Sequence, residues 1–150
     1  MDTDLDHIKT EAARLSPLAH VATIGADGEP DVVPVHPAWE GDTIWFLAAT
    51  DSVKARNVAH HAGVAMHWQV SAAGDGGEVW GTAEVHDDVD TKRRLWTGVF
   101  DYDLGDFAPG GPDDSPTMAF IAVRPQRAVY LEMYGMKGRW TWSAAPTSTG

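Results

Sequence analysis

Cysteine is absent from the 150 residues of this chain. Its absence excludes disulfide bonds, zinc sites with thiolate ligands and cysteine nucleophiles. Basic residues are also few, since 11 lysines and arginines stand against 22 aspartates and glutamates and the formal net charge is −11. Such a chain repels the phosphates of nucleic acids, so we expect no nucleic-acid partner. A small anionic ligand stays compatible with this charge, because a few local cations and a helix terminus can bind it.

Long hydrophobic runs are missing too. No segment approaches the roughly 20 apolar residues that span a bilayer, and Met1–Asp6 lacks the basic start and apolar stretch of a signal peptide. The sequence therefore predicts a cytoplasmic protein without membrane association. Its length and its 43% of hydrophobic residues predict one folded domain over residues 1–150. Within it we expect an N-terminal helical segment over 1–16 and a loose tail over 144–150.

The common catalytic motifs are not found either. The sequence contains no Walker A motif, no GxGxxG, no HExxH and no GxSxG. Seven histidines are present, but their spacing is poor for a metal; His60 and His61, for example, are adjacent on a predicted helix and point in different directions. Acidic pairs fall in predicted turns, where helix caps and solvated loops usually place them. We therefore predict neither a catalytic side chain nor a metal ligand from motifs.

Short alternating segments, separated by turn residues, make up most of the chain. Expected strands cover 18–25, 31–36, 43–47, 64–70, 78–86, 117–123 and 128–133, the last two joined at Arg124–Gln126, and expected helices cover 4–15, about 53–61 and a segment that starts at Asp88 or Asp90. Tight turns between consecutive strands favour an antiparallel sheet. Glycine and proline inside strands, such as Pro34, favour a sheet that closes into a barrel. The predicted fold class is mainly β, a β-barrel of six to seven antiparallel strands with short helices.

One segment, Ala49–Asn57, joins the end of a strand to the start of a helix. Exposed N–H groups and the helix dipole at such a start favour an anion. Ser52 can donate its hydroxyl to a phosphate oxygen, and Lys54, which shares a helix face with Asn57, adds a positive charge in the first turn. Arg56 is a second cation nearby. The segment predicts either a phosphate site or a capped helix with exposed cations.

Tryptophan is frequent, with seven in 150 residues. Most of them lie in or beside expected strands or in the C-terminal segment, namely Trp39, Trp45, Trp68, Trp80, Trp140 and Trp142. Tryptophan usually belongs to a core or an interface, because it buries a large area and keeps one polar N–H. Stacking on a planar ligand is the alternative.

Several segments follow one another in an order and spacing that resembles a known family. They are Ala22–Pro30, Val33–Val35, Asp42–Phe46, Ser52–Val58, Gly81–Val85, and the stretch from Leu95 through Gly111–Asp114 to Val123–Pro125. Together they resemble the pyridoxamine 5′-phosphate oxidase-like split β-barrel superfamily, over roughly residues 5–134. The similarity is strongest to the small general-stress-protein-type members and to the flavin/deazaflavin oxidoreductases of actinobacteria.

The resemblance implies a homodimer with two cofactor sites at the subunit interface, each holding FMN. By position, the isoalloxazine ring would be lined by Val33, Pro34, Val35 and His36. The ribityl phosphate end would be held by Thr50, Ser52, Lys54 and Asn57. Further candidates are Trp68 and Gln69 on the following strand, and Trp140 reaching across from the partner subunit.

The function that follows is a flavin-binding oxidoreductase that acts on a small molecule, in which the cofactor carries the redox chemistry. One alternative is an F420 (deazaflavin)-dependent reductase, whose long anionic tail would need cations beyond Lys54. Another is a non-enzymatic flavin- or haem-binding stress protein, with His36 or His67 as the axial ligand of a haem. Because one fold supports different activities, the fold leaves these alternatives open.

Overall fold

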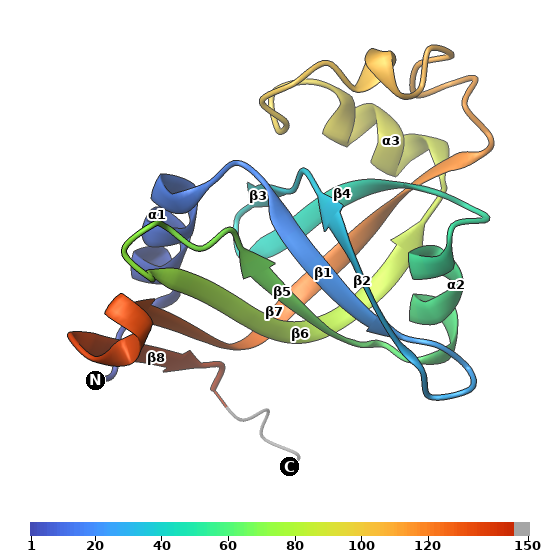
Figure 1. Cartoon of the computed structure of the whole chain (residues 1–150). Helices are drawn as coiled ribbons and strands as arrows, with labels where there is room; N and C mark the ends of the chain where they lie inside the picture. Colours follow the sequence, from blue (N-terminus) through green and yellow to red (C-terminus); the bar gives the residue numbers. More distant parts are fainter. Residues whose placement is uncertain (146–150) are drawn as a thin grey trace.

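One strongly bent antiparallel sheet, with three α-helices packed around it, makes up the protein (Figure 1). The computed structural model describes residues 1–145. The strands are β1 (Ala19–Ile24), β2 (Pro30–Val35), β3 (Ala38–Glu40), β4 (Thr43–Ala49), β5 (Gly63–Trp68), β6 (Gly76–His86), β7 (Met118–Glu132) and β8 (Gly138–Ser143). The α-helices are α1 (Leu5–Leu15), α2 (Val53–His60) and α3 (Val89–Trp96), and two 3-10 turns are η1 (Leu104–Asp106) and η2 (Met133–Gly135).

Each α-helix begins after a side chain that accepts a hydrogen bond from the backbone N–H three residues on. These caps are Asp4, Ser52 and Asp88, and each satisfies one of the donors left free at a helix start. The helices expected over 4–15 and 53–61 are confirmed to within a residue at each end, and Asp88 rather than Asp90 starts the third.

The sheet has the strand order β2-β1-β5-β6-β7-β4-β3, with β8 paired to β7 off this path. All pairings between the named strands are antiparallel, as expected. The expected count of six to seven strands is wrong, because the sheet has eight: β3 and β8 were not anticipated as strands. The expected closure is also wrong, since within residues 1–145 the edge strands β2 and β3 do not pair with each other. Pro30 and Pro34 lie on β2, and a proline has no N–H with which to continue a ladder.

The strands expected over 117–123 and 128–133 form a single strand, β7. The prediction of a connection at Arg124–Gln126 is therefore wrong. The pairing of β6 with β7 shifts register there: Trp80 faces Arg127, but Gly81 faces Pro125, which leaves Gln126 as an extra residue. Such a β-bulge bends a strand without ending it and accepts a proline inside the sheet. A Cβ atom at Gly81 would collide with the backbone carbonyl of Arg124.

Both faces of β4 and β7 are buried, which gives the protein two cores. On the inner face, Phe46 and Ile121 belong to the main core, which α1 and α2 also cover. On the outer face, Trp45 and Phe120 pack with Leu95 of α3 and with residues of the connection that leads from α3 to β7. This second core places that connection, residues 97–117, above the sheet as a separate layer (Figure 1).

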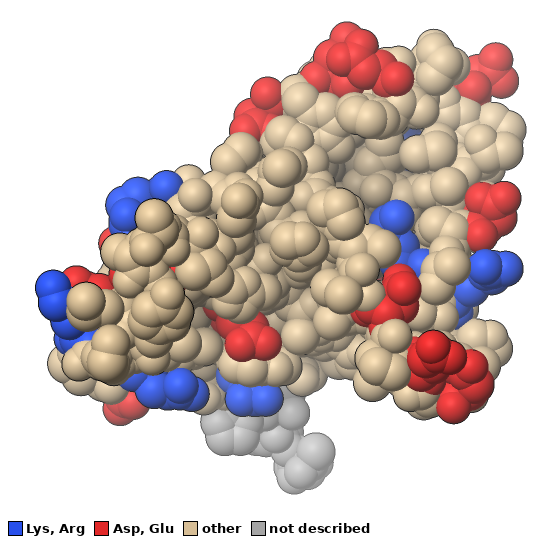
Figure 2. Space-filling view, viewed as in Figure 1, with Lys and Arg blue, Asp and Glu red and all other residues tan. Residues whose placement is uncertain are grey.

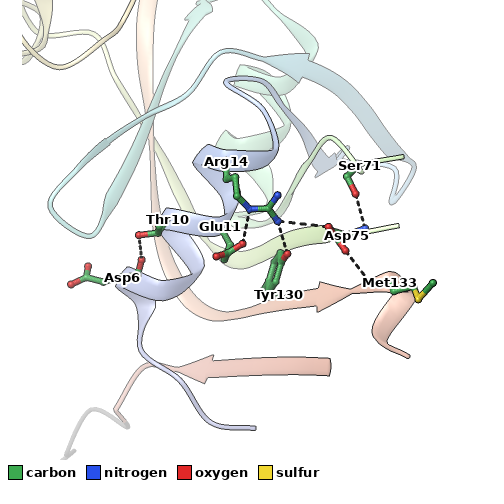
Figure 3. A network of polar contacts seen from close by, with 8 residues as sticks. All are labelled: Asp6, Thr10, Glu11, Arg14, Ser71, Asp75, Tyr130 and Met133. Atoms are coloured by element: carbon green, nitrogen blue, oxygen red, sulfur yellow. Dashed lines mark hydrogen bonds and ion pairs between the residues drawn. The ribbon is translucent and has the colours of Figure 1, made fainter. Parts of the chain in front are cut away.

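A network of polar contacts ties α1 to the loop between β5 and β6 and to the turn between β7 and β8 (Figure 3). The Arg14 guanidinium donates to Glu11 and to the hydroxyl of Tyr130, at 2.9 and 2.7 Å, and lies 3.7 Å from the Asp75 carboxylate. Asp75 in turn accepts a 2.9 Å hydrogen bond from the backbone N–H of Met133. This N–H, more than any other group, holds the pKa of Asp75 below its usual range. The network stabilises the turn that leads into β8.

The tail expected to be loose from residue 144 lies mostly outside the described residues. Of its residues, 146–150 are not described, and Ala144 donates its backbone N–H to the carbonyl of Gln126 at 2.8 Å.

The bulge can be tested with two glycine variants. We expect Gly81→Ala to lower the free energy of unfolding by about 1–3 kcal/mol, because the added methyl group must push apart the backbones of β6 and β7. Gly77→Ala is the matched control, since Gly77 also lies on β6 but an added Cβ there makes only ordinary contact, at 3.7 Å from the Cβ of Ala12. Equilibrium unfolding in urea measures both variants, and equal losses would contradict the close approach at Gly81.

Candidate functional site

A cavity of about 310 Å³ opens where the ends of β2 and β4 meet the start of α2 and the connection from α3 to β7. Its lining residues are Pro34, Val35, His36, Leu47, Ala48, Ala49, Lys54, Tyr102, Phe107 and Met118. The surface is visibly hollowed between the upper layer and the strands below it (Figure 2). Most of the lining is apolar or aromatic, and Lys54 is its only charged residue apart from histidine.

The turn between β4 and α2 positions Lys54 at one end of this cavity. The hydroxyl of Ser52 donates to the carbonyl of Ala49 at 2.7 Å and accepts from the N–H of Ala55 at 3.3 Å, so it fixes the angle between strand and helix. Lys54 is half-buried. Within the described residues, none of the ion pairs involves Lys54.

Aromatic side chains form another part of the lining. The ring of His36 stacks on that of Tyr102, with centroids 4.2 Å apart and planes at 27°. Its Nε2 atom lies 2.6 Å from a carboxylate oxygen of Asp101, but the geometry of this contact is not that of a hydrogen bond. Burial, with a further contribution from Asp101, raises the pKa of Tyr102 to about 12.

The structure brings four of the residues predicted for the site into the lining of this cavity, namely Pro34, Val35, His36 and Lys54. Thr50 and Ser52 lie in the adjoining turn. The hydroxyl of Thr50 donates to the carbonyl of Thr117 at 3.3 Å, and Ser52 is engaged as the helix cap. Val33 packs against the main core rather than lining the cavity.

The other predicted residues lie elsewhere in the chain. Asn57 is buried, and its side-chain amide donates to the hydroxyl of Thr23 at 3.0 Å. Trp68 is buried in the main core and stacks on Trp39. Gln69 is exposed just beyond the end of β5.

Trp140 lies beside α1, far along the sheet from the cavity within one chain. Its ring contacts those of His7 and Tyr130, with centroids 5.9 and 5.8 Å away. A contact from Trp140 to the site of a partner subunit therefore stays a prediction.

Sequence reasoning missed the walls that the upper layer and β4 supply, above all Tyr102 and Phe107. A signal was present, because both aromatics stand in a stretch otherwise rich in glycine, proline and aspartate. Phe107 is 63% exposed, so it lines the cavity from the surface of the molecule.

A second hollow, of about 570 Å³, lies on the other side of α2, against the turn between β1 and β2. Arg56 and His60 line one wall, and Asp27, Glu29 and Asp31 line the other. Arg56 thus faces a different hollow from Lys54. Among residues 1–145, no group of three or more histidine, aspartate or glutamate side chains is arranged to hold a metal ion.

The outer face of β2, β1, β5 and β6 carries an apolar row beside a row with the polar residues His20, His67 and Glu78. By strand register, Val32, Ala22, Ala65 and Trp80 form a row across it, and an apolar hollow of about 450 Å³ lies on this face. Val32 is 62% exposed. The α-helices stand at the margins of this face (Figure 1). No helix in the described part of the chain has the length and apolar character needed to cross a bilayer.

Comparison with known proteins places this geometry in context. The family model for pyridoxamine 5′-phosphate oxidase matches residues 7–132. Among curated proteins, none is significantly similar to the chain.

Several solved structures resemble the chain. A protein from Clostridium acetobutylicum related to general stress protein 26 is 19% identical, with 94% of this chain and 96% of that chain covered and a TM-score of 0.76. A pyridoxamine 5′-phosphate oxidase-related, FMN-binding protein from Nostoc punctiforme is 15% identical, with 95% of each chain covered and a TM-score of 0.65. An F420 reductase is 28% identical, with 76% of this chain and 90% of that chain covered and a TM-score of 0.57.

The buried hydrogen bond from Asn57 to Thr23 predicts that Asn57 stabilises the fold, whether or not it also contacts a ligand. We expect Asn57→Ala to lower the free energy of unfolding by about 1–3 kcal/mol, because it removes a buried hydrogen bond and leaves the Thr23 hydroxyl unpaired. Arg56→Ala, at the exposed neighbouring position, is the control and should change stability little. Urea denaturation measures both, and an unchanged midpoint for Asn57→Ala would contradict the structural role.

Proposed function

The chain belongs to the pyridoxamine 5′-phosphate oxidase family, and we propose that it is an FMN-binding oxidoreductase whose cofactor lies between two copies of the chain. The observation that carries the proposal is the position of Lys54. Lys54 is a half-buried residue that lines the apolar cavity, and it forms no ion pair within the described residues. An unpaired cation next to the free N–H groups of a helix start favours an anion.

The donor set of the cavity fits FMN. Lys54 and the backbone at the start of α2 suit the phosphate, which gains a charged hydrogen bond and the favourable end of the helix dipole. Pro34, Val35 and the end of β4 supply apolar walls that suit a planar ring. In this arrangement the chain binds, orients and shields the cofactor from water.

The redox chemistry in this proposal belongs to the flavin, which transfers hydride or single electrons when bound. The chain then needs no dedicated acid or base, which agrees with the absence of catalytic motifs from its sequence. Tyr102 offers the cavity a neutral hydroxyl, and burial, which raises its pKa to about 12, makes its ionisation still harder than that of an ordinary tyrosine.

The apolar row on the outer face of β2, β1, β5 and β6 supports the homodimer. Ala22, Ala65 and Gly63 are small, and they allow a second backbone to approach closely. Val32 and Ile24 are 62% and 42% exposed, a contiguous apolar surface of the kind that marks interaction sites. The exposed edge strand β2, which carries Pro34 of the cavity, belongs to the same surface, so an interface there would adjoin the cofactor.

An F420-dependent reductase is the second candidate, because the F420 reductase structure is 28% identical to this chain. The long anionic tail of that cofactor would need several cations, and the cavity offers Lys54 alone. FMN is therefore the better supported cofactor. A haem is less well supported, since the His36 ring is already stacked on Tyr102 and its Nε2 contacts Asp101.

The phosphate assignment can be tested by removing the cation. We expect Lys54→Ala to weaken FMN binding by about 1–3 kcal/mol, the loss of one charged hydrogen bond. Arg56→Ala is the matched control, because Arg56 lies two residues along the same helix but lines the other hollow. Quenching of flavin fluorescence measures the affinities. Equal affinity for the wild type and Lys54→Ala would remove the phosphate assignment.

The dimer can be tested on the outer face. We expect Ala65→Glu to shift the protein from twice the chain mass to the chain mass, since it places an uncompensated charge in the middle of the interface. Val89→Glu is the control, because Val89 is 40% exposed at the start of α3, away from this face. Size-exclusion chromatography with light scattering gives the masses. A wild-type monomer would contradict the proposed interface.

A further inference from the structure

The hollow of about 570 Å³ beside α2 carries charges of both signs that the cofactor proposal does not use. Arg56 and His60 lie four residues apart and therefore share one face of α2. Asp27, Glu29 and Asp31 line the hollow from the turn between β1 and β2 and from β2 itself. Among residues 1–145, no ion pair includes any of these five side chains. The charged groups of the two walls therefore face each other beyond the distance of a direct ion pair.

A buried hydrogen-bond acceptor lies between these walls. Asn57 lines the hollow, although the residue is only 8% exposed. Its side-chain nitrogen donates to the Thr23 hydroxyl at 3.0 Å, whereas no residue within 1–145 donates to its side-chain oxygen. A Cβ atom added at Gly25 would lie 3.4 Å from that oxygen, so the oxygen lies next to another residue of the lining. Because a buried acceptor without a donor is unfavourable, this atom needs a donor that enters through the hollow.

Asp31 brings a carboxylate close to this acceptor. In the antiparallel register Asp31 lies opposite Thr23, and cross-strand partners point to the same face of a sheet. Asp31 and Asn57 therefore both lie beside Thr23. Asp31 is half-buried there, whereas Arg56 is exposed on the helix. One part of the hollow thus offers a carboxylate and an amide oxygen, which accept hydrogen bonds, and another part offers a guanidinium, which donates them.

We propose that this hollow binds a small zwitterion, namely an amino acid with a cationic side chain. An ammonium group of the ligand meets Asp31 and the Asn57 oxygen, and its carboxylate meets the guanidinium of Arg56, which binds carboxylates through parallel N–H groups. Three carboxylates against one arginine and one histidine give the lining a negative balance, so a ligand with a net positive charge is favoured over a neutral one. The proposal goes beyond the cofactor and does not rest on it, because Lys54 lines a different cavity.

The test uses L-lysine, which carries two ammonium groups and a carboxylate, and two analogues that each lack one of these groups. Lysinamide lacks the carboxylate, and norleucine lacks the ammonium group of the side chain. Titrations of isotope-labelled protein, followed by amide NMR in physiological salt, give the dissociation constants, and the side-chain amide signal of Asn57 reports binding in this hollow. We expect L-lysine to bind about threefold to tenfold more tightly than either analogue.

The comparison with lysinamide separates a built site from general attraction. The chain has a net charge of −11, and lysinamide is more positive than L-lysine, so attraction to an acidic surface alone favours lysinamide. Recognition of the carboxylate by Arg56 predicts the opposite order. Tighter binding of lysinamide, or an unmoved amide signal of Asn57 when L-lysine is added, would overturn the proposal.

Two substitutions locate the charges. Arg56→Gln should abolish the preference for L-lysine over lysinamide, whereas Arg139→Gln, which removes the same charge from an exposed position on β8, should retain it. Asp31→Asn should weaken L-lysine about threefold or more, whereas Asp87→Asn, at an exposed position beyond β6, should not. If Asp31→Asn fails to fold, Glu29→Gln replaces it, because Glu29 is exposed. Unchanged affinity for L-lysine in the Arg56 and acidic variants would overturn the proposal.

Addition of FMN distinguishes this inference from the cofactor proposal. We expect equal affinity for L-lysine with and without FMN, because the two ligands occupy cavities on different sides of α2. Failure of FMN to bind the wild type would overturn the cofactor and leave the titration with L-lysine valid. Competition between FMN and L-lysine would overturn the separate site.

Discussion

The pairing of β6 with β7 is the constraint on which the rest of the architecture depends. β7 pairs with β6 along nearly its whole length, and its other edge is shared between β4 and β8. The bulge at Gly81 and Pro125 lets these two long strands bend together. Because the sheet bends, β2 and β4, which are far apart in the strand order, both reach the same cavity. A flat sheet of the same order would leave their side chains on separate surfaces.

The candidate site follows from that bend together with one helix cap. Ser52 turns the chain from β4 into α2 and so directs Lys54 towards the end of β2. The second core then holds the connection from α3 beside the cavity, where Tyr102 stacks on His36. The result is a largely apolar cavity in which Lys54 is the one lysine or arginine of the lining. Such a site is suited to position a flavin, while the cofactor supplies the chemistry.

Prediction from the sequence succeeded where the signal was local. The helix start at Asp88, the strand alternation and the strand-to-helix turn at Lys54 are all encoded within a few residues. It failed where a proline was taken for the end of a strand, because the β-bulge that accommodates Pro125 depends on Gly81 in a distant strand. Asn57 shows the same limit, since its spacing from Lys54 predicted only a shared helix face, whereas its hydrogen bond to Thr23 joins α2 to the distant strand β1.

The sequence by itself determined the fold class, the antiparallel pairing and the cation at the start of α2, because alternation, turns and caps are short-range properties of the chain. Only the tertiary structure decided that the sheet stays open, that eight strands form it and that Tyr102 and Phe107 complete the cavity. These features depend on contacts between residues far apart along the chain. Their physical cause is packing on both faces of β4 and β7, which no local pattern of residues specifies.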